Sequence, residues 1–195
     1  MNRNVRLFDR ISWLYGLFYK RQVKAFKKRF LPNIPEDVLG CETVLDVGGG
    51  TGALGTVLYD AGFKVTVLDA SSDMLNVAKV KVGSRKIEFI QSDFSKEVFF
   101  SEGVFDFVVA SYVLHGLDKK TRYQVYKNMK DVAKIKVLIY EHSGEGSLLI
   151  PIVEKLEGGD YVNFVRDGET EMRSIFKKVH RVKISKKTVL YVCEV

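Results

Sequence analysis

The chain has 195 residues, of which 46% are hydrophobic, and its formal net charge is +7. This length and composition suit one domain with a proper core and exclude a disordered or fibrous chain. The apolar runs are far shorter than the roughly 20 residues that cross a bilayer, so no transmembrane helix is expected. Two cysteines are too few to indicate a disulfide framework or a zinc site, so we predict a cytoplasmic protein without a metal.

The positive charge is concentrated at the start of the chain. Nine Lys or Arg and one Asp lie within residues 1–31, and the remainder is close to neutral. Aromatic residues recur there at helical spacing, among them Phe8 and Phe26, which predicts one or two helices that end near Pro32. The basic face is either solvated, bound to a membrane surface or in contact with RNA. We therefore predict a helical segment over 1–40, followed by a domain over 41–195.

From residue 43 onward, short β-branched runs alternate with helical patterns, which is typical of βαβ units. Two strand-like runs near the end, joined by Lys186 and Lys187, predict an antiparallel hairpin. The expected fold is α/β, with a single Rossmann-like doubly wound sheet, mostly parallel, an antiparallel C-terminal hairpin strand and N-terminal helices. The expected strands cover 43–47, 64–68, 87–90, 104–110, 135–141, 180–185 and 188–195, and the expected helices cover 52–61, 71–81, 118–132 and a range near 169–178.

A glycine-rich turn follows the first of these strands. Gly48, Gly49, Gly50 and Gly52 lie between an apolar strand and a helix start, an arrangement that brings backbone against a nucleotide-like ligand. Alone, the pattern also fits a dinucleotide site or an empty turn. Asp46 argues against a dinucleotide and for a cationic cofactor, because a carboxylate there would repel a pyrophosphate and attract a cation. S-adenosylmethionine carries a sulfonium and an ammonium and no phosphate, although a turn-capping role for this acid stays open.

Further acids follow the next two strands, at the end of the sheet where ligands of α/β proteins collect. Asp69 lies 17 residues after Gly52, where a carboxylate can accept hydrogen bonds from ribose hydroxyls. Asp93 either binds the adenine amino group or caps a turn, and Phe94 either covers the ring or belongs to the core. Ser71 is a helix cap as readily as a site residue. The predicted cofactor residues are Asp46, Gly48, Gly49, Gly50, Gly52, Asp69, Ala70, Met74, Ser92, Asp93, Phe94 and Ser111.

These four motifs, in order over about 43–141, resemble the class I S-adenosylmethionine-dependent methyltransferases, close to the ubiquinone/menaquinone-biosynthesis type. The resemblance implies that Asp46 and the glycines bind the methionine side, Asp69 the ribose, and Asp93 with Phe94 the adenine. The Phe8-Asp9-Arg10 start followed by Tyr15 is also similar to that group, which implies N-terminal helices that cover the site. S-adenosyl-L-methionine is therefore the expected cofactor and S-adenosyl-L-homocysteine the product.

Methyl transfer requires alignment and sometimes a base, so few catalytic residues are expected. The candidates are His115, which is the first choice, and Tyr112, His142 and Tyr15. Each also has a structural interpretation, because a lone His at a strand end is more often a hydrogen-bonded structural residue. Apolar residues between Gly144 and Gly168 indicate either a lid or acceptor pocket, or an ordinary crossover helix that covers the sheet.

The sequence argues against some acceptors. The segment after the fourth strand reads Ser111-Tyr112-Val113-Leu114-His115, which lacks the Asn/Asp-Pro-Pro-Tyr/Phe motif of amino-directed nucleobase enzymes. It also lacks the cysteine of cytosine C5 chemistry. We predict methyl transfer to a small molecule by direct displacement. An RNA methyltransferase that uses the basic N-terminal helix, or a non-catalytic cofactor-binding scaffold, is the alternative.

Overall fold

The structure is a computed structural model, which describes residues 18–96, 100–145 and 160–195. The chain divides into two compact units, Met1–Phe94 and Ser95–Val195. Within the described ranges, none of the helices combines the length and the apolar character that a membrane span needs.

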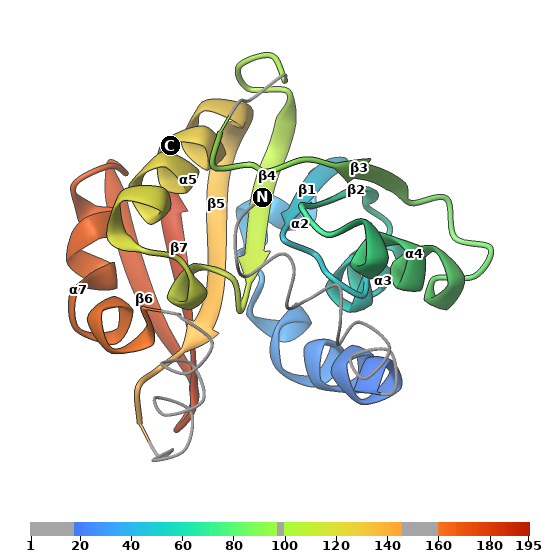
Figure 1. Ribbon diagram of the computed structural model, residues 1–195, viewed down its shortest axis with the longest axis horizontal. Helices are drawn as coiled ribbons and strands as arrows, with labels where there is room; N and C mark the ends of the chain where they lie inside the picture. The colour runs from blue at the N-terminus through green and yellow to red at the C-terminus, as the bar shows by residue number, and fades with distance from the viewer. Residues whose placement is uncertain (1–17, 97–99, 146–159) are drawn as a thin grey trace. The chain divides into compact units, whose positions relative to one another are not determined.

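The first unit contains three parallel strands in the order β3-β2-β1 (Figure 1). They are β1 (Thr43–Val47), β2 (Lys64–Asp69) and β3 (Glu88–Gln91), and the last four residues of β1 are buried. The connecting helices α3 (Ala53–Asp60) and α4 (Ser72–Lys81) both contact β2. This alternation confirms the βαβ units predicted for this part of the chain.

The described residues before β1 are mostly helical. A helix over 18–29 is followed by the short turn η1 (Leu31–Asn33), which contains Pro32, and by α2 (Glu36–Leu39). Tyr19, Phe26 and Phe30 are buried, as the helical periodicity predicts. The earlier part of the predicted segment, including Tyr15, lies outside the described residues.

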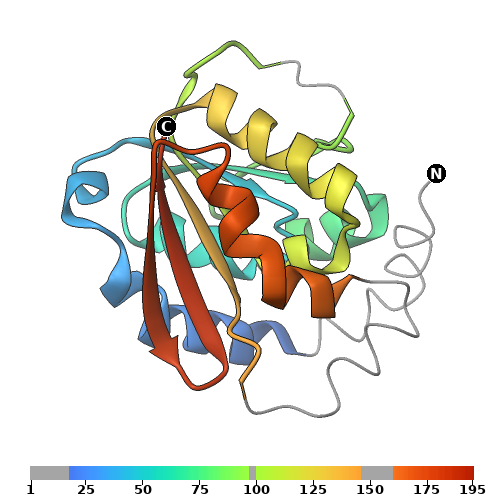
Figure 2. The ribbon, with the colours of Figure 1, turned by 90° about the vertical axis from the view of Figure 1, so that its left-hand side faces the viewer.

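The second unit contains four strands in the order β4-β5-β7-β6. Its elements are β4 (Phe105–Ser111), η2 (Leu114–Gly116), α5 (Lys119–Val132), β5 (Ala133–His142), α7 (Tyr161–Arg173), β6 (Lys178–Ser185) and β7 (Thr188–Glu194). Strand β4 is parallel to β5, whereas β7 is antiparallel to β5 and β6, which confirms the predicted hairpin. Helices α5 and α7 contact each other and lie side by side (Figure 2).

One predicted helix is misplaced. The range near 169–178 was expected to be helical, but α7 runs from Tyr161 to Arg173, and Lys178 already begins β6. Tyr161, Phe164 and Met172 are buried along one face of α7, so packing extends the helix toward its N-terminus. The crossover-helix interpretation therefore holds for 161–164, whereas 148–153 lies outside the described residues.

Candidate functional site

The turn between β1 and α3 has a backbone that only glycine adopts readily. Gly48, Gly50 and Gly52 have φ angles of +66°, +52° and +72°. The N–H groups of Gly48 and Gly49 donate to the carbonyl of Leu68 at 2.7 and 3.2 Å, which attaches the turn to β2. The glycine loop is therefore a fixed feature of the first unit.

No side chain fits beneath this loop. A β-carbon added at Gly49 would lie 2.7 Å from Val67 and 2.8 Å from the carboxylate of Asp46. One added at Gly50 would lie 3.1 Å from the methyl group of Met74. The loop backbone thus lies directly over a carboxylate and a thioether, with space only for hydrogen atoms.

Asp46 is fully buried beneath the loop, and neither carboxylate oxygen has a hydrogen-bond partner within the described part of the chain. Burial, with a smaller contribution from the negative charge of Asp69, raises the pKa of Asp46 to about 8, although the backbone N–H of Gly55, which is nearby but outside hydrogen-bond geometry, lowers it in part. A buried carboxylate without a counter-ion fits a ligand that brings positive charge. S-adenosylmethionine has that charge, so the residues present fit the predicted cofactor.

Asp69 joins the glycine loop to the start of α4. Its carboxylate accepts hydrogen bonds from the N–H groups of Gly50 and Ser71, both at 2.9 Å. Ser71 is the N-cap of α4, because its hydroxyl accepts from the N–H of Met74 at 3.1 Å, which confirms the capping interpretation. The acid predicted to bind ribose therefore already fixes the shape of the loop.

The remaining predicted cofactor residues fall in two places. Ser92 N–H donates to the carbonyl of Asp69 at 3.1 Å, so the segment after β3 adjoins the end of β2. Phe94 is buried, and Asp93 is partly exposed beside it. Ser111 ends β4 in the second unit. Ser92 therefore lies next to Asp69, which accepts a hydrogen bond from the glycine loop.

The helix over 18–29 contacts the start of α3. The hydroxyl of Tyr19 lies 2.6 Å from that of Thr56, and Thr51 donates to the side-chain oxygen of Gln22 at 3.0 Å. Thr51 and Thr56 are buried. The described part of the N-terminal segment therefore lies next to the glycine loop.

A second group of polar residues surrounds Glu141, at the end of β5. Its Oε1 accepts hydrogen bonds from the N–H groups of Val113 and Leu114, at 2.8 and 2.7 Å. Its Oε2 lies 2.6 Å from Nδ1 of His115 and accepts from the N–H of His142 at 3.3 Å. Full burial would raise the pKa of Glu141, but the charge and hydrogen bond of His115 outweigh it and hold that pKa below its usual value. Glu141 is therefore a buried anion.

Four rings gather beside this carboxylate, and we call them the ring cluster. The centroid of His142 lies 4.6 Å from Tyr112, 5.0 Å from His115 and 5.8 Å from Tyr161, and His115 lies 6.0 Å from Tyr161. His115 is 6% exposed, whereas Tyr112 is 37% exposed. Three of the four predicted catalytic residues thus meet in the second unit.

The backbone of Tyr112 is strained, with a φ of +56°, a value that bulky residues avoid. Its N–H donates to the carbonyl of Tyr140 at 2.9 Å, and its hydroxyl lies 3.4 Å from that of Thr188. These contacts from β5 and β7 hold the side chain next to His142.

Sequence reasoning missed Tyr161 and gave Glu141 no firm role. Tyr161 was missed because the helix that carries it was placed too late in the chain. Glu141 follows the buried run Val137–Tyr140. An acid that directly extends such a run is unusual, and this was the available signal.

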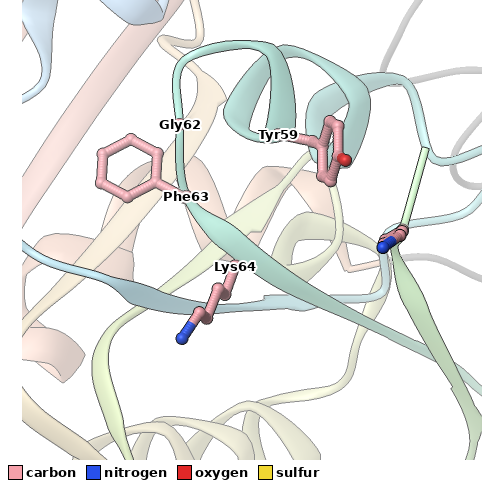
Figure 3. Close-up of a pocket in the computed structure, with 5 residues that line it drawn as sticks. Tyr59, Gly62, Phe63 and Lys64 are labelled. Atoms are coloured by element: carbon pink, nitrogen blue, oxygen red, sulfur yellow. The ribbon is translucent and has the colours of Figure 1, made fainter.

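A hollow elsewhere in the first unit lies apart from the glycine loop. It is lined by Tyr59, Gly62, Phe63, Lys64 and Lys86, four of which are labelled in Figure 3. Lys64 begins β2, whereas Asp69 ends it, so the hollow is at the opposite end of that strand. Lys64 is also paired with Glu42. The hollow therefore adds nothing to the predicted cofactor site.

Comparison with known proteins shows which family the central part of the chain resembles. Residues 44–136, which include the glycine loop, Asp69, His115 and the whole of α5, match the family model described as a methyltransferase domain. This stretch of the chain is therefore similar to a methyltransferase domain. Its cofactor class, S-adenosylmethionine, follows from this domain together with the Rossmann-like fold.

Curated relatives also carry methyltransferase names. The domain is 42% identical over 67 residues to YqeM of Bacillus subtilis, a match that covers 34% of this chain and 27% of YqeM. It is 38% identical over 69 residues to the cypemycin N-terminal methyltransferase of a Streptomyces species, covering 35% of this chain and 27% of that protein. The matches thus span well under half of these relatives.

Solved structures with low sequence identity have the same fold. PH0226 from Pyrococcus horikoshii superposes with a TM-score of 0.71 at 21% identity, covering 90% of both chains. The magnesium protoporphyrin IX methyltransferase of Synechocystis, solved with bound SAH, has a TM-score of 0.62 at 15% identity and covers 91% of this chain and 84% of that one. The chain therefore has the fold of these structures.

Proposed function

We propose that this protein is an enzyme that transfers a methyl group from S-adenosylmethionine to a small-molecule acceptor by direct displacement. The observation that carries the proposal is the buried, unpaired carboxylate of Asp46 beneath the glycine loop. Such a group is unfavourable in the absence of a cation, and neither of its oxygens has a hydrogen-bond partner among residues 18–96, 100–145 and 160–195. The narrower resemblance to ubiquinone and menaquinone biosynthesis enzymes stays a prediction.

The first unit would hold the cofactor. Asp46 would offset positive charge, Asp69 has carboxylate oxygens suited to ribose hydroxyls, and the glycine loop allows close backbone approach. When bound, S-adenosylmethionine supplies an activated methyl group and its own leaving group. The helix over 18–29, through Tyr19 and Gln22, would keep the loop in place.

The second unit would hold the base. Glu141 faces Nδ1 of His115 at 2.6 Å, an arrangement that favours a proton on Nδ1 and leaves the lone pair on Nε2. The same carboxylate would stabilise the positive charge that His115 gains on accepting a proton. Tyr112 and His142, which adjoin His115 in the ring cluster, would orient the acceptor.

A base of this kind suits an acceptor that loses a proton on methylation, such as a hydroxyl or an amine. The names of the relatives include a peptide N-terminus and a porphyrin, so the fold accommodates acceptors of different chemistry. The ring cluster offers flat apolar faces in addition to the imidazoles, which fits a small organic molecule.

The test is binding followed by turnover. Calorimetric titration of ligand-free protein with S-adenosylmethionine should give saturable binding, whereas NAD should give none. A screen of hydroxyl and amine acceptors, read by release of S-adenosylhomocysteine, should then yield a substrate, and His115→Ala should abolish its turnover while cofactor affinity is retained. Binding of NAD alone would refute the cofactor, and cofactor binding without any turnover would favour a scaffold.

A further inference from the structure

A buried ion cluster joins three segments of the second unit. The guanidinium of Arg122 on α5 is fully buried and donates to both carboxylate oxygens of Glu171 on α7, at 2.9 and 3.0 Å. Its Nη1 also donates to Asp160, directly before α7, at 2.9 Å, and to the carbonyl of Leu117 at 2.5 Å. One side chain therefore holds the loop after His115 and two points of α7. We call this group the Arg122 clamp.

The clamp is connected to the ring cluster through Asp160. The backbone N–H of Asp160 donates to the carbonyl of His115 itself, at 3.1 Å. The next residue, Tyr161, places its ring 6.0 Å from His115 and 5.8 Å from His142. A displacement of Asp160 would therefore move Tyr161 relative to both imidazoles.

Stability alone gives no strong reason for such a clamp. Removing three charged groups from water costs much of what their attraction returns, so apolar replacements of buried ion pairs are often neutral or stabilising. The ring of Phe164 lies 5.7 Å from the guanidinium carbon, so apolar packing is available beside it. What Arg122 adds is direction, because its planar fork fixes two carboxylates and a carbonyl in one geometry.

We propose that Arg122 is a positioning residue of the acceptor site, which acts through Asp160 and Leu117 to hold Tyr161 and the His115 loop in one arrangement. This inference rests on the proposed function of His115 as the base. By keeping Tyr161 against His115, the clamp limits access to an imidazole that is only 6% exposed. It thereby limits the size of the acceptors that reach the base.

The chain's three histidines allow a test that needs no acceptor. Diethyl pyrocarbonate modifies neutral imidazoles, and mass spectrometry of the peptides gives separate rates for His115, His142 and His180. The side chain of His180 is 52% exposed on β6 and serves as the internal standard. Each rate is measured across a pH series, so the midpoint of each histidine's titration is obtained as well.

Asp160→Ala removes one arm of the clamp and leaves the Arg122–Glu171 pair. The rate at His115, relative to His180, should rise about tenfold because the ring opens locally more often, and its titration midpoint should shift. Asp160→Asn keeps an oxygen that accepts from Arg122, so its rate and midpoint should return toward the wild-type values. Arg122→Met should behave like Asp160→Ala; where it fails to fold, Asp160→Ala decides, because the Asp160 side chain is 24% exposed.

The matched control is Arg173→Gln, which breaks the exposed Arg173–Glu169 pair on the same helix and should leave the His115 rate unchanged. The proposal would be overturned if folded Asp160→Ala protein had the wild-type modification rate and the wild-type titration midpoint at His115. A different result would refute the proposed function, namely methyl transfer that persists in His115→Ala. That result would not change the modification rates that test the clamp.

Discussion

Two buried carboxyl groups, one in each unit, have pKa values shifted in opposite directions. Asp46 and Glu141 are both fully buried near the end of a strand, yet the pKa of Asp46 is raised to about 8 and that of Glu141 is lowered. Glu141 accepts three backbone hydrogen bonds and faces the imidazole of His115, whereas neither oxygen of Asp46 has a partner among the described residues. Burial is common to both, so the difference comes from their partners.

The site around Glu141 is electrostatically complete, whereas the site around Asp46 is not. Glu141 has its counter-charge within its own fold and organises the loop that carries His115. Asp46 has no hydrogen-bond partner in the described part of the chain, and a cationic ligand would supply its counter-charge. A buried acid without a partner, such as Asp46, therefore indicates a binding site for a cationic ligand. A buried acid with partners, such as Glu141, shows how the protein positions its own side chains.

The largest expected effect concerns Asp46. Between pH 4 and 8 the unfolded chain ionises this acid and the folded chain keeps it protonated, so the free energy of unfolding should fall as pH rises, by about 1.4 kcal/mol per pH unit. Asp46→Asn should remove this slope and be more stable than wild type at pH 8, with little difference near pH 4. Urea unfolding across the pH range measures it, and the exposed Asp73→Asn is the control.

If the free energy of unfolding fell equally with pH in Asp46→Asn and in wild type, Asp46 would not have a raised pKa in the folded protein. Addition of S-adenosylmethionine to wild type should also release a proton, which calorimetry in buffers of different ionisation enthalpy detects.

The next largest effect is at Glu141. Glu141→Gln replaces one carboxylate oxygen with an NH2 group, which cannot accept the hydrogen bonds made to that oxygen, so the free energy of unfolding should fall by about 3 kcal/mol at pH 7. Because the pKa of Glu141 is lowered on folding, its contribution is present above the unfolded pKa and is lost as pH falls through the folded one. The stabilities of the variant and wild type should therefore approach each other in acid. Thermal unfolding at pH 3 and pH 7 measures this, and an equal difference in stability at both pH values would contradict it.

A smaller effect is expected at the glycine loop. Gly49→Ala would force the new β-carbon against Val67 and Asp46, which should destabilise the fold by about 2 kcal/mol and weaken cofactor binding. Gly40→Ala, where nothing lies within 4 Å of the added carbon, is the control. Chemical denaturation and calorimetric titration of both variants are the measurements, and equal behaviour would show that the loop can relax away from Asp46.

The smallest effect is expected at Thr51, whose hydroxyl donates to Gln22. Thr51→Val keeps the shape and removes one partly buried hydrogen bond, so a loss of about 1 kcal/mol is expected. Protection of helix 18–29 in hydrogen exchange should fall, whereas that of β5 should not. Unchanged protection would mean that this contact does not hold the helix on the first unit.

The sequence by itself determined the strand and helix pattern, the glycine loop and the acid near the end of each of the first two strands. These features are local: alternation, glycine spacing and strand-end acids are all set by neighbours in the chain. It also determined that His115 and His142 follow strands of the same sheet.

Only the tertiary structure decided which of these groups have partners. Glu141 meets Val113, Leu114 and His115 across 26 to 28 residues of chain, and Arg122 meets Glu171 across 49. The start of α7 was likewise missed because burial of Tyr161 and Phe164 extends that helix. Hydrogen-bond partners and burial depend on packing between distant segments, so the opposite states of Asp46 and Glu141 could not be predicted from residue type or spacing.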